Sequence, residues 1–291
     1  MPIAPANGIE IYYEEAGDPA DPALVMIMGL AGQQVHWAPE LIEGFAAQGF
    51  RVISFDNRDV GLSTHVDAPI DVMAVLAARG AGEAVAVPYV VADMAQDVVG
   101  LLDHLGIEQA HVLGVSLGGM VAQALAIAHP QRVRTLTSIM STTGDPDVGA
   151  PTWDAMGMLL RPPSRTVEEH MDGAVAVAQV IGTPGMIDED RIRRTAARAW
   201  ERSYDPAGAA RQLAGVMASP SRSPALARLD VPTLVIHGTA DPLVQPDGGE
   251  RTAEVVPDAK LLLIEGMGHD LPAAHWATVI DAVTAHALAH Q

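Results

Sequence analysis

Residues 111–129, HVLGVSLGGMVAQALAIAH, decide the fold of this chain. After His111 the run Val112–Val115 has no polar side chain, Ser116 is the centre of a Gly-x-Ser-x-Gly motif over residues 114–118, and Leu117–His129 carries apolar residues at helical spacing. This order is typical of a buried strand that turns sharply into a helix. Gly114 and Gly118 allow strand and helix to pack closely because they have no side chain. A serine in such a turn has a strained backbone and an exposed hydroxyl at the positive end of the helix dipole, so Ser116 is a candidate nucleophile rather than a helix cap.

Further short segments repeat the strand pattern. Residues 9–15 alternate apolar and polar side chains, which indicates an edge strand with one wet face. Four short runs rich in apolar and β-branched residues are typical of parallel strands buried on both faces: Leu24–Met28, Arg51–Phe55, Thr233–His237 and Lys260–Ile264. Helical spacing occurs over Pro39–Gln48, Val90–Leu105, Asp247–Val256 and Pro272–His290. Strands that alternate with helices predict an α/β fold with a mostly parallel, doubly wound sheet.

The alternation stops between residues 142 and 226. This segment is rich in Met, Pro and Gly, has helical patterns at Thr166–Ile181 and Glu189–Arg202, and contains no convincing strand. A helical insertion between two parallel strands is expected to cover the carboxyl edge of the sheet, where open α/β sheets bind ligands. We therefore predict one core domain, residues 1–141 and 227–291, and a helical cap over residues 142–226.

A nucleophilic serine needs a base, and the chain has 11 histidines. A hydroxyl attacks well only when an imidazole takes its proton. His269 lies in Glu265-Gly-Met-Gly-His269-Asp, between the last predicted strand and the last predicted helix. That is the place of the base when the chain order is Ser, Asp, His, so His269 is preferred and His36 is the second candidate.

The acid that orients the base should lie between Ser116 and His269. Asp241 comes four residues after the run Thr233–His237, in a turn that contains Gly, Ala and Pro, and is preferred, although an ordinary turn aspartate would look the same. The acid can also follow the preceding strand. That alternative nominates Asp145 or Asp147.

Acyl transfer also needs hydrogen-bond donors for a tetrahedral oxyanion, usually two backbone N–H groups. One is expected from Leu117, the residue after the nucleophile. For the second we nominate the N–H of Leu30, in the loop Gly29-Leu30-Ala31-Gly32 after an early strand.

Two groups of charged residues are interpreted as structural. The loop Asp56-Asn-Arg58-Asp-Val-Gly61-Leu-Ser63 follows a strand, and we expect Arg58 to pair with a nearby carboxylate rather than with substrate. Five arginines on one predicted helix are expected to form a solvated face that pairs with the acidic surface, with recognition of an anionic substrate as the alternative: Arg191, Arg193, Arg194, Arg198 and Arg202.

The predicted cap contains many methionines and two tryptophans, an adaptable apolar set. We predict that Gly29, Trp153 and Met156 contact the hydrophobic acyl part of a substrate. Each methionine taken alone can equally serve to pack the cap on the core.

Composition excludes several functions. The chain has no cysteine, which removes thiolate nucleophiles and cysteine-ligated metals, and 17 basic against 36 acidic residues give a net charge of −19. Such a surface repels nucleic acid and anionic lipid, so neither is expected as a partner, and it indicates solubility or adaptation to high salt. The N-terminus lacks the pattern of a signal peptide, and no apolar run could span a bilayer, so we expect a cytoplasmic protein.

Taken together, these motifs resemble the α/β-hydrolase superfamily over essentially the whole chain. Met28-Gly29, the Asp56–Ser63 loop and Gly-Met-Gly-His269 look like the aclacinomycin methylesterase-type branch. The resemblance implies ester hydrolysis, and this branch suggests a methyl ester on a bulky polyketide. It argues against dehalogenases and epoxide hydrolases, which carry aspartate where this chain has Ser116. Members of this superfamily usually have His-Gly before the residue that supplies the second oxyanion donor, whereas this chain has Met28-Gly29. This departure affects only the nomination of Leu30 as that donor.

We therefore predict a serine carboxylesterase that acts on a small-molecule ester and needs no metal or cofactor. Three alternatives remain on the same residues. Two are enzymatic, perhydrolysis and hydrolysis of a C–C bond. The third is a ligand receptor that keeps the fold without turnover.

Overall fold

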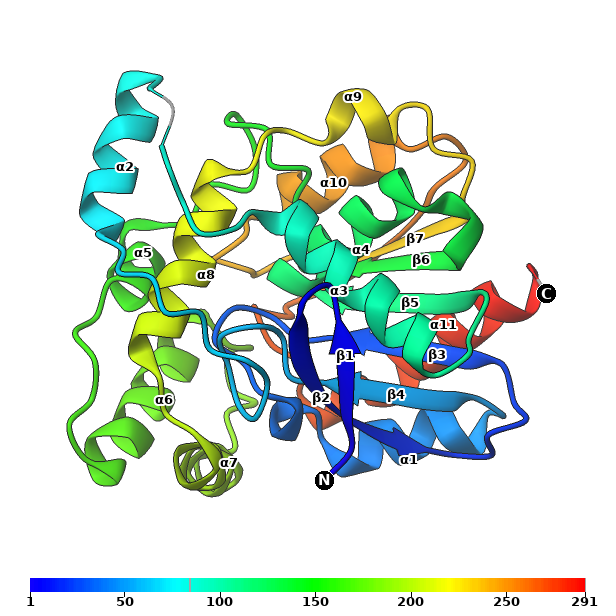
Figure 1. Ribbon diagram of the computed structural model, residues 1–291, viewed down its shortest axis with the longest axis horizontal. Helices are drawn as coiled ribbons and strands as arrows, with labels where there is room; N and C mark the ends of the chain where they lie inside the picture. The colour runs from blue at the N-terminus through cyan, green and yellow to red at the C-terminus, as the bar shows by residue number, and fades with distance from the viewer. Residues whose placement is uncertain (84, 291) are drawn as a thin grey trace.

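The computed structural model describes residues 1–83 and 85–290 and is built on one eight-stranded sheet (Figure 1). The strand order is β1-β2-β4-β3-β5-β6-β7-β8. β2 runs antiparallel to both of its neighbours, and all pairs from β4 to β8 are parallel. The strands are β1 Ile3–Ala6, β2 Ile9–Ala16, β3 Ala23–Ile27, β4 Arg51–Phe55, β5 Ala110–Val115, β6 Val133–Ile139, β7 Thr233–Gly238 and β8 Lys260–Ile264.

Helices cover both faces of the sheet and bury its apolar side chains in two clusters. On one face, α3 (Val91–His104), α4 (Leu117–Ala128) and α10 (Pro246–Val255) pack against the strands. On the other face lie α1 (Pro39–Ala47) and α11 (Ala273–Leu288), which contact each other. This is the doubly wound arrangement that the alternation of strands and helices predicts, and the expected fold class is confirmed.

Residues 140–232, between β6 and β7, contain helices and no strand; we call them the helical segment. The helices of the segment are α5 Trp153–Leu159, α6 Val167–Ile181, α7 Glu189–Arg202, α8 Pro206–Ala218 and α9 Ser223–Leu226. In Figure 1 helices α5 to α8 of this segment gather at one end of the sheet, with α2 (Val72–Ala81), which follows β4, beside α8, whereas α9 lies near α10. Two short 3-10 turns, η1 Gln34–His36 and η2 Pro130–Arg132, complete the elements.

The sheet differs from the sequence prediction at both edges and in its interior. β1 and β6 were not predicted, and because β1 forms the edge, the prediction that residues 9–15 form an edge strand is wrong. β6 carries buried polar residues, so it lacks a continuous apolar run: Thr135 Oγ1 lies 2.8 Å from His111 Nδ1, and Ser138 Oγ accepts a bond from Gln123. The true second edge is β8. Leu261 and Leu263 there are 41% and 40% exposed, against the expected burial on both faces.

Helices α2, α5, α8 and α9 were also not predicted, because their apolar residues are interrupted by Gly, Pro and Ser. Among the residues that the structure describes, no helix is both long and apolar enough to cross a membrane.

Candidate active site

Ser116 occupies the turn between β5 and α4. Its backbone has φ 54° and ψ −119°, a region that residues with a side chain rarely adopt. The Ser116 amide donates to the carbonyl oxygen of Ile139 at 2.9 Å, which ties the strained residue to the end of β6.

The glycines on either side of Ser116 are required by close backbone contacts. A Cβ atom on Gly114 would lie 2.0 Å from the carbonyl oxygen of Gly118. One on Gly118 would lie 2.0 Å from the carbonyl oxygen of Ile27, at the end of β3. Strand, helix and neighbouring strand therefore meet at a distance that only glycine permits.

The structure brings together the three residues that the sequence nominated. His269 Nε2 lies 2.9 Å from Ser116 Oγ, and His269 Nδ1 lies 2.7 Å from Asp241 Oδ2. Ser116 follows β5, Asp241 follows β7, and His269 follows β8, so all three stand at the carboxyl edge of the sheet. When Nδ1–H donates to Asp241, the lone pair of Nε2 faces the serine hydroxyl and can accept its proton.

The Asp241 carboxylate is buried and fully engaged by hydrogen bonds. Its Oδ1 accepts the backbone N–H groups of Leu243 and Val244, at 2.8 and 2.9 Å. Burial opposes ionisation, but the hydrogen bonds from His237 and His269 outweigh it and hold the pKa of Asp241 at about 2. The side chain is therefore an anion at neutral pH, as an orienting acid must be.

The alternative acids have other partners. Asp145 accepts hydrogen bonds from the hydroxyls of Ser221 and Ser223, and Arg251 Nη1 lies 3.0 Å from it. Although burial opposes ionisation, these bonds lower the pKa of Asp145 to about 2. Asp147 pairs with Arg251 at 3.1 Å. Both carboxylates thus hold the loop after β6 rather than the imidazole of His269.

His36, the second candidate base, is also engaged elsewhere. Its Nδ1 atom lies 3.0 Å from the backbone nitrogen and 3.1 Å from the carbonyl oxygen of Gln33, the residue before η1. Burial lowers the pKa of His36, so its ring is neutral at physiological pH.

The two nominated oxyanion donors lie on either side of the serine. A Cβ atom on Gly29 would be 3.3 Å from Ser116 Cβ, so the loop that carries Leu30 passes directly over the nucleophile. Among the described residues, neither the N–H of Leu30 nor that of Leu117 has a protein acceptor. Both groups are therefore available to a ligand.

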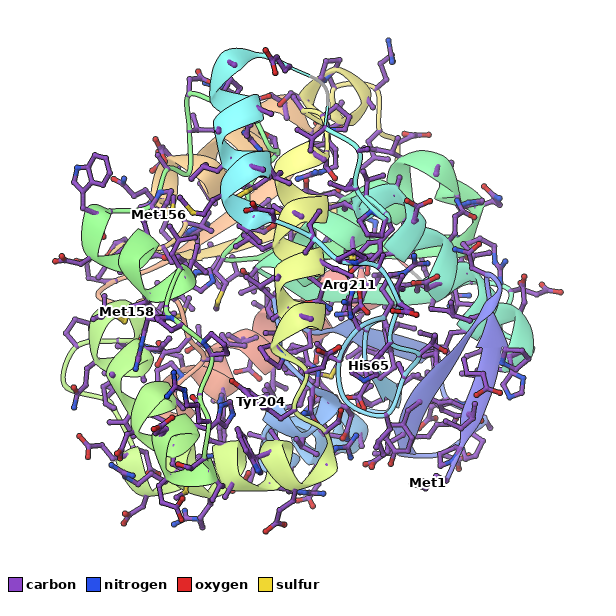
Figure 2. The ribbon with its side chains drawn as sticks, turned by 60° about the vertical axis from the view of Figure 1, so that its left-hand side comes forward. Met1, His65, Met156, Met158, Tyr204 and Arg211 are labelled. Atoms are coloured by element: carbon purple, nitrogen blue, oxygen red, sulfur yellow. The ribbon has the colours of Figure 1, made fainter. Side chains whose placement is uncertain are left out.

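A cavity of about 1700 Å³ opens beside Ser116, between the carboxyl edge of the sheet, α2 and the helical segment. Gly29 and Met156, two predicted substrate contacts, line it. Figure 2 shows Met156 and Met158 on α5 and Tyr204 at the start of the turn into α8. Trp153 does not line the cavity: it is the first residue of α5 and is 92% exposed. Its predicted contact with substrate is therefore wrong, because a side chain at that position points to solvent.

Ion pairs connect the loop after β4, and the arginines of α7, to neighbouring elements. Arg58 binds both oxygens of Asp97 in α3, at 2.6 and 2.5 Å, which confirms that it pairs with a carboxylate. Arg191 and Arg193 pair with the exposed acids Glu40 and Asp172, as expected of a solvated face. Arg202 differs, because its Nη2 atom lies 2.6 Å from Oδ2 of Asp56, a fully buried carboxylate. For this residue the expectation of a solvated face is wrong.

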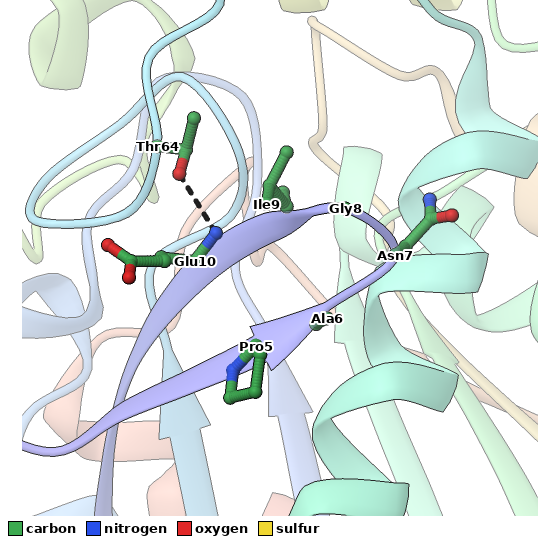
Figure 3. A pocket seen from close by; sticks show the side chains of 7 residues that line it. All are labelled: Pro5, Ala6, Asn7, Gly8, Ile9, Glu10 and Thr64. Atoms are coloured by element: carbon green, nitrogen blue, oxygen red, sulfur yellow. Dashed lines mark hydrogen bonds between the residues drawn. The ribbon is translucent and has the colours of Figure 1, made fainter.

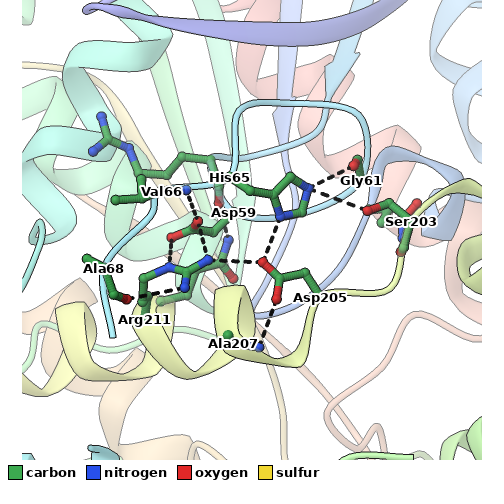
Figure 4. Close-up of polar contacts among 12 residues, drawn as sticks. Asp59, Gly61, His65, Val66, Ala68, Ser203, Asp205, Ala207 and Arg211 are labelled. Carbon is green, nitrogen blue, oxygen red and sulfur yellow. Dashed lines mark hydrogen bonds and ion pairs between the residues drawn. The ribbon is translucent and has the colours of Figure 1, made fainter. Parts of the chain in front are cut away.

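A second polar network joins α8 to the same loop (Figure 4). Asp59, His65 and Asp205 bring their ligand atoms within 4.8 Å of one another, a spacing that could suit a metal ion. Arg211 Nη2, however, lies 2.8 Å from Asp59 and 3.0 Å from Asp205. The guanidinium of Arg211 already bridges both carboxylates and occupies oxygen atoms that a metal ion would need, so these residues do not fit a metal.

Sequence reasoning missed Gln212, which holds the loop that carries Leu30. Gln212 in α8 is fully buried; its Oε1 accepts the N–H of Ala31 at 2.8 Å, and its Nε2 donates to the carbonyl oxygen of Arg58 at 2.7 Å. Gln212 thus spans the loops after β3 and β4. No local pattern marks it, because both partners are remote in sequence.

A shallow depression of about 530 Å³ lies on the β1–β2 hairpin (Figure 3). The contact drawn there is the bond from the Glu10 N–H to the Thr64 hydroxyl, at 2.9 Å. The depression contains none of the residues that surround Ser116.

Comparison with known proteins agrees with this geometry. A family model described as the alpha/beta hydrolase fold matches residues 22–273. The rhodomycin D methylesterase of Streptomyces sp. (strain C5) is 30% identical over 300 residues, covering 96% of this chain and 95% of that protein, and its counterpart from Streptomyces peucetius is 30% identical over 301 residues with the same coverage. The crystal structure of the enol-lactonase from Burkholderia xenovorans LB400 superposes with a TM-score of 0.75 at 24% identity, covering 98% of this chain and 99% of the other.

Proposed function

The chain belongs to the α/β hydrolase family, and from this premise we propose that it hydrolyses carboxylic esters through an acyl-enzyme formed on Ser116. The observation that carries the proposal is the pair of distances that link Ser116, His269 and Asp241, 2.9 and 2.7 Å. Few other roles require a strained serine, an imidazole and a buried carboxylate in one line.

In the first half-reaction, Ser116 Oγ attacks the ester carbonyl as its proton passes to His269 Nε2. Asp241 holds the ring and stabilises the imidazolium that forms. The imidazolium then protonates the departing alkoxide. In the second half-reaction, His269 takes a proton from water as the water oxygen attacks the acyl carbonyl. The bond between that carbon and Ser116 Oγ then breaks, and the imidazolium returns its proton to Oγ, which releases the acid and restores the serine.

We propose that the N–H groups of Leu30 and Leu117 stabilise the oxyanion in both half-reactions. Their free donors on either side of Ser116 support this role. Loss of one such donor typically lowers turnover ~10²–10³-fold. Gln212 would set the donor of Leu30 in place, because it binds the next residue of the loop.

We infer that the substrate is an ester of a large apolar molecule. The relatives from both Streptomyces species are named rhodomycin D methylesterases, and the cavity of about 1700 Å³ exceeds the roughly 300–1,000 Å³ of common small-molecule sites. Gly29 and Met156 would contact that molecule. Residues 142–226 would serve as the cap that encloses it.

The proposal is tested with p-nitrophenyl esters and a phosphonate probe. We expect a burst of p-nitrophenol, stoichiometric labelling of Ser116, and loss of both in Ser116→Ala. His269→Ala and Asp241→Asn should lose at least ~10³-fold in kcat, as triad residues do. Asp147→Asn, which alters an exposed carboxylate, is the matched control and should retain activity.

Each alternative has its own outcome. Full activity in Asp241→Asn, together with loss of activity in Asp145→Asn, would show that Asp145 and not Asp241 is the orienting acid. Labelling of Ser116 without turnover of any ester, together with ligand binding that survives Ser116→Ala, would instead establish a receptor.

A further inference from the structure

The C-terminal end of α6 contacts the loop that carries His269. The N–H of His269 itself donates to the carbonyl oxygen of Ile181 at 2.7 Å. One residue earlier, the N–H of Gly268 donates to Thr183 Oγ1 at 3.0 Å. The N–H groups of Gly268 and His269 are thus bound by the helical segment, whereas Gly266 and Met267, earlier in the same loop, are bound by the turn after β7.

Thr183 also binds the residue on the other side of His269. Its N–H and its hydroxyl both donate to Asp270 Oδ1, at 2.9 and 2.5 Å. Because the hydroxyl accepts from Gly268 while it donates to Asp270, this single side chain bridges both neighbours of the base. Thr183 is 1% exposed, so water does not compete for these bonds.

The two segments approach each other closely at this junction, where both carry a glycine. A Cβ atom on Gly268 would lie 2.4 Å from the carbonyl carbon of Gly182, and one on Gly182 would lie 3.1 Å from Asp270 Oδ2. Residues 181–183 and 268–270 therefore form one unit, which we call the clasp.

We propose that Thr183 and Asp270 are positioning residues that hold His269 in line with Ser116 and Asp241. The inference rests on the proposed function, since it assigns the two residues to the base of that reaction. They act through His269, whose own N–H is part of the clasp. A further consequence is that this end of α6 cannot move away from the core without carrying the base out of line.

The test compares variants that remove the bonds of the clasp with variants that keep them. Thr183→Val keeps the shape of the side chain and loses both hydroxyl bonds, whereas Thr183→Ser keeps them. Asp270→Ala removes the acceptor, whereas Asp270→Asn retains an oxygen at the same place. Thr284→Val is the matched control, because Thr284 is also buried and its hydroxyl has no partner among the described residues.

We expect Thr183→Val and Asp270→Ala to lower kcat on p-nitrophenyl esters ~10²-fold with little change in KM. A misplaced His269 stabilises the transition state less well, whereas substrate binding is unaffected. Thr183→Ser, Asp270→Asn and Thr284→Val should keep most of the wild-type kcat. Thermal unfolding midpoints, measured in parallel, separate this effect from loss of folded protein.

Three results would overturn the inference. One is a kcat in Thr183→Val equal to that of Thr284→Val, and another is a loss found in KM alone. The third is a failure of Thr183→Ser to restore kcat. If Thr183→Val does not fold, the comparison of kcat and KM between Asp270→Ala and Asp270→Asn tests the inference by the same criteria. All three results presuppose an active wild type, whereas failure of the proposed function would appear as an inactive wild type.

Discussion

At the scale of single residues, the Asp241 carboxylate links the chemistry to stability. Its pKa falls from an ordinary 3.8 to about 2 on folding, because hydrogen bonds to the anion outweigh burial. At pH values above the unfolded pKa, this shift contributes on the order of 2 kcal/mol to the free energy of unfolding. The contribution is lost as the pH falls toward the folded pKa. We therefore expect Asp241→Asn to be less stable than wild type near neutral pH.

Urea unfolding of both proteins checks this prediction. The difference in free energy of unfolding should shrink by about half when the pH is lowered from about 5 to about 3. A difference that stays constant over this range would mean that the charge of Asp241 contributes nothing and that only its shape matters.

The residues of the candidate site could be predicted from the sequence where chain order and turn chemistry specify them. Ser116, Asp241 and His269 each follow a strand, and parallel strands end at one edge. The same reasoning failed for Trp153, because composition says that a segment is apolar and not which side chain points inward. It could not find Thr183, whose partner Asp270 is remote along the chain.

At the scale of elements, the packing of α4 against β3 depends on Gly118. A side chain there would meet the carbonyl oxygen of Ile27 at 2.0 Å, and backbone atoms cannot rotate away. We expect Gly118→Ala to destabilise the protein by several kcal/mol, in the upper range of single substitutions, or to prevent folding. Gly157→Ala in α5 is the matched control, because nothing lies within 4 Å of its Cβ position.

Circular dichroism melts of the two variants give the measurement. Gly157→Ala should be neutral or stabilised by roughly 0.5–1 kcal/mol, since alanine favours helices. Equal melting temperatures for both variants would show that the turn at Ser116 relaxes more readily than its contacts suggest.

Among the parallel strands, those in which apolar residues stand side by side could be predicted, whereas β6, in which polar residues separate them, could not. β6 is buried yet contains Thr135 and Ser138, whose hydroxyls bond to His111 and Gln123. Burial of a hydroxyl is acceptable only when its hydrogen bond is made, and the partner is visible only in three dimensions.

At the scale of the whole molecule, the net charge of −19 opposes compaction through self-repulsion. Raising NaCl from about 0.01 M to about 1 M shortens the Debye length from about 30 to about 3 Å. We expect the melting temperature to rise over this range. Buried pairs such as Arg58–Asp97 and Arg211–Asp59 are screened much less, so they should not reverse the trend. A falling melting temperature would show that attractive surface pairs outweigh the repulsion.

The helical segment interrupts the chain between two strands that are neighbours in the sheet. β6 and β7 pair directly, although residues 140–232 separate them. The entropy lost on closing a chain loop grows only logarithmically with its length, by about 0.6 kcal/mol for each doubling. Insertions and deletions within this excursion therefore change the free energy of sheet formation very little. Evolution can therefore change the walls of the cavity while the strand ends that hold Ser116, Asp241 and His269 stay in register. The condition is that residues 181–183 keep their hydrogen bonds to the loop that carries His269.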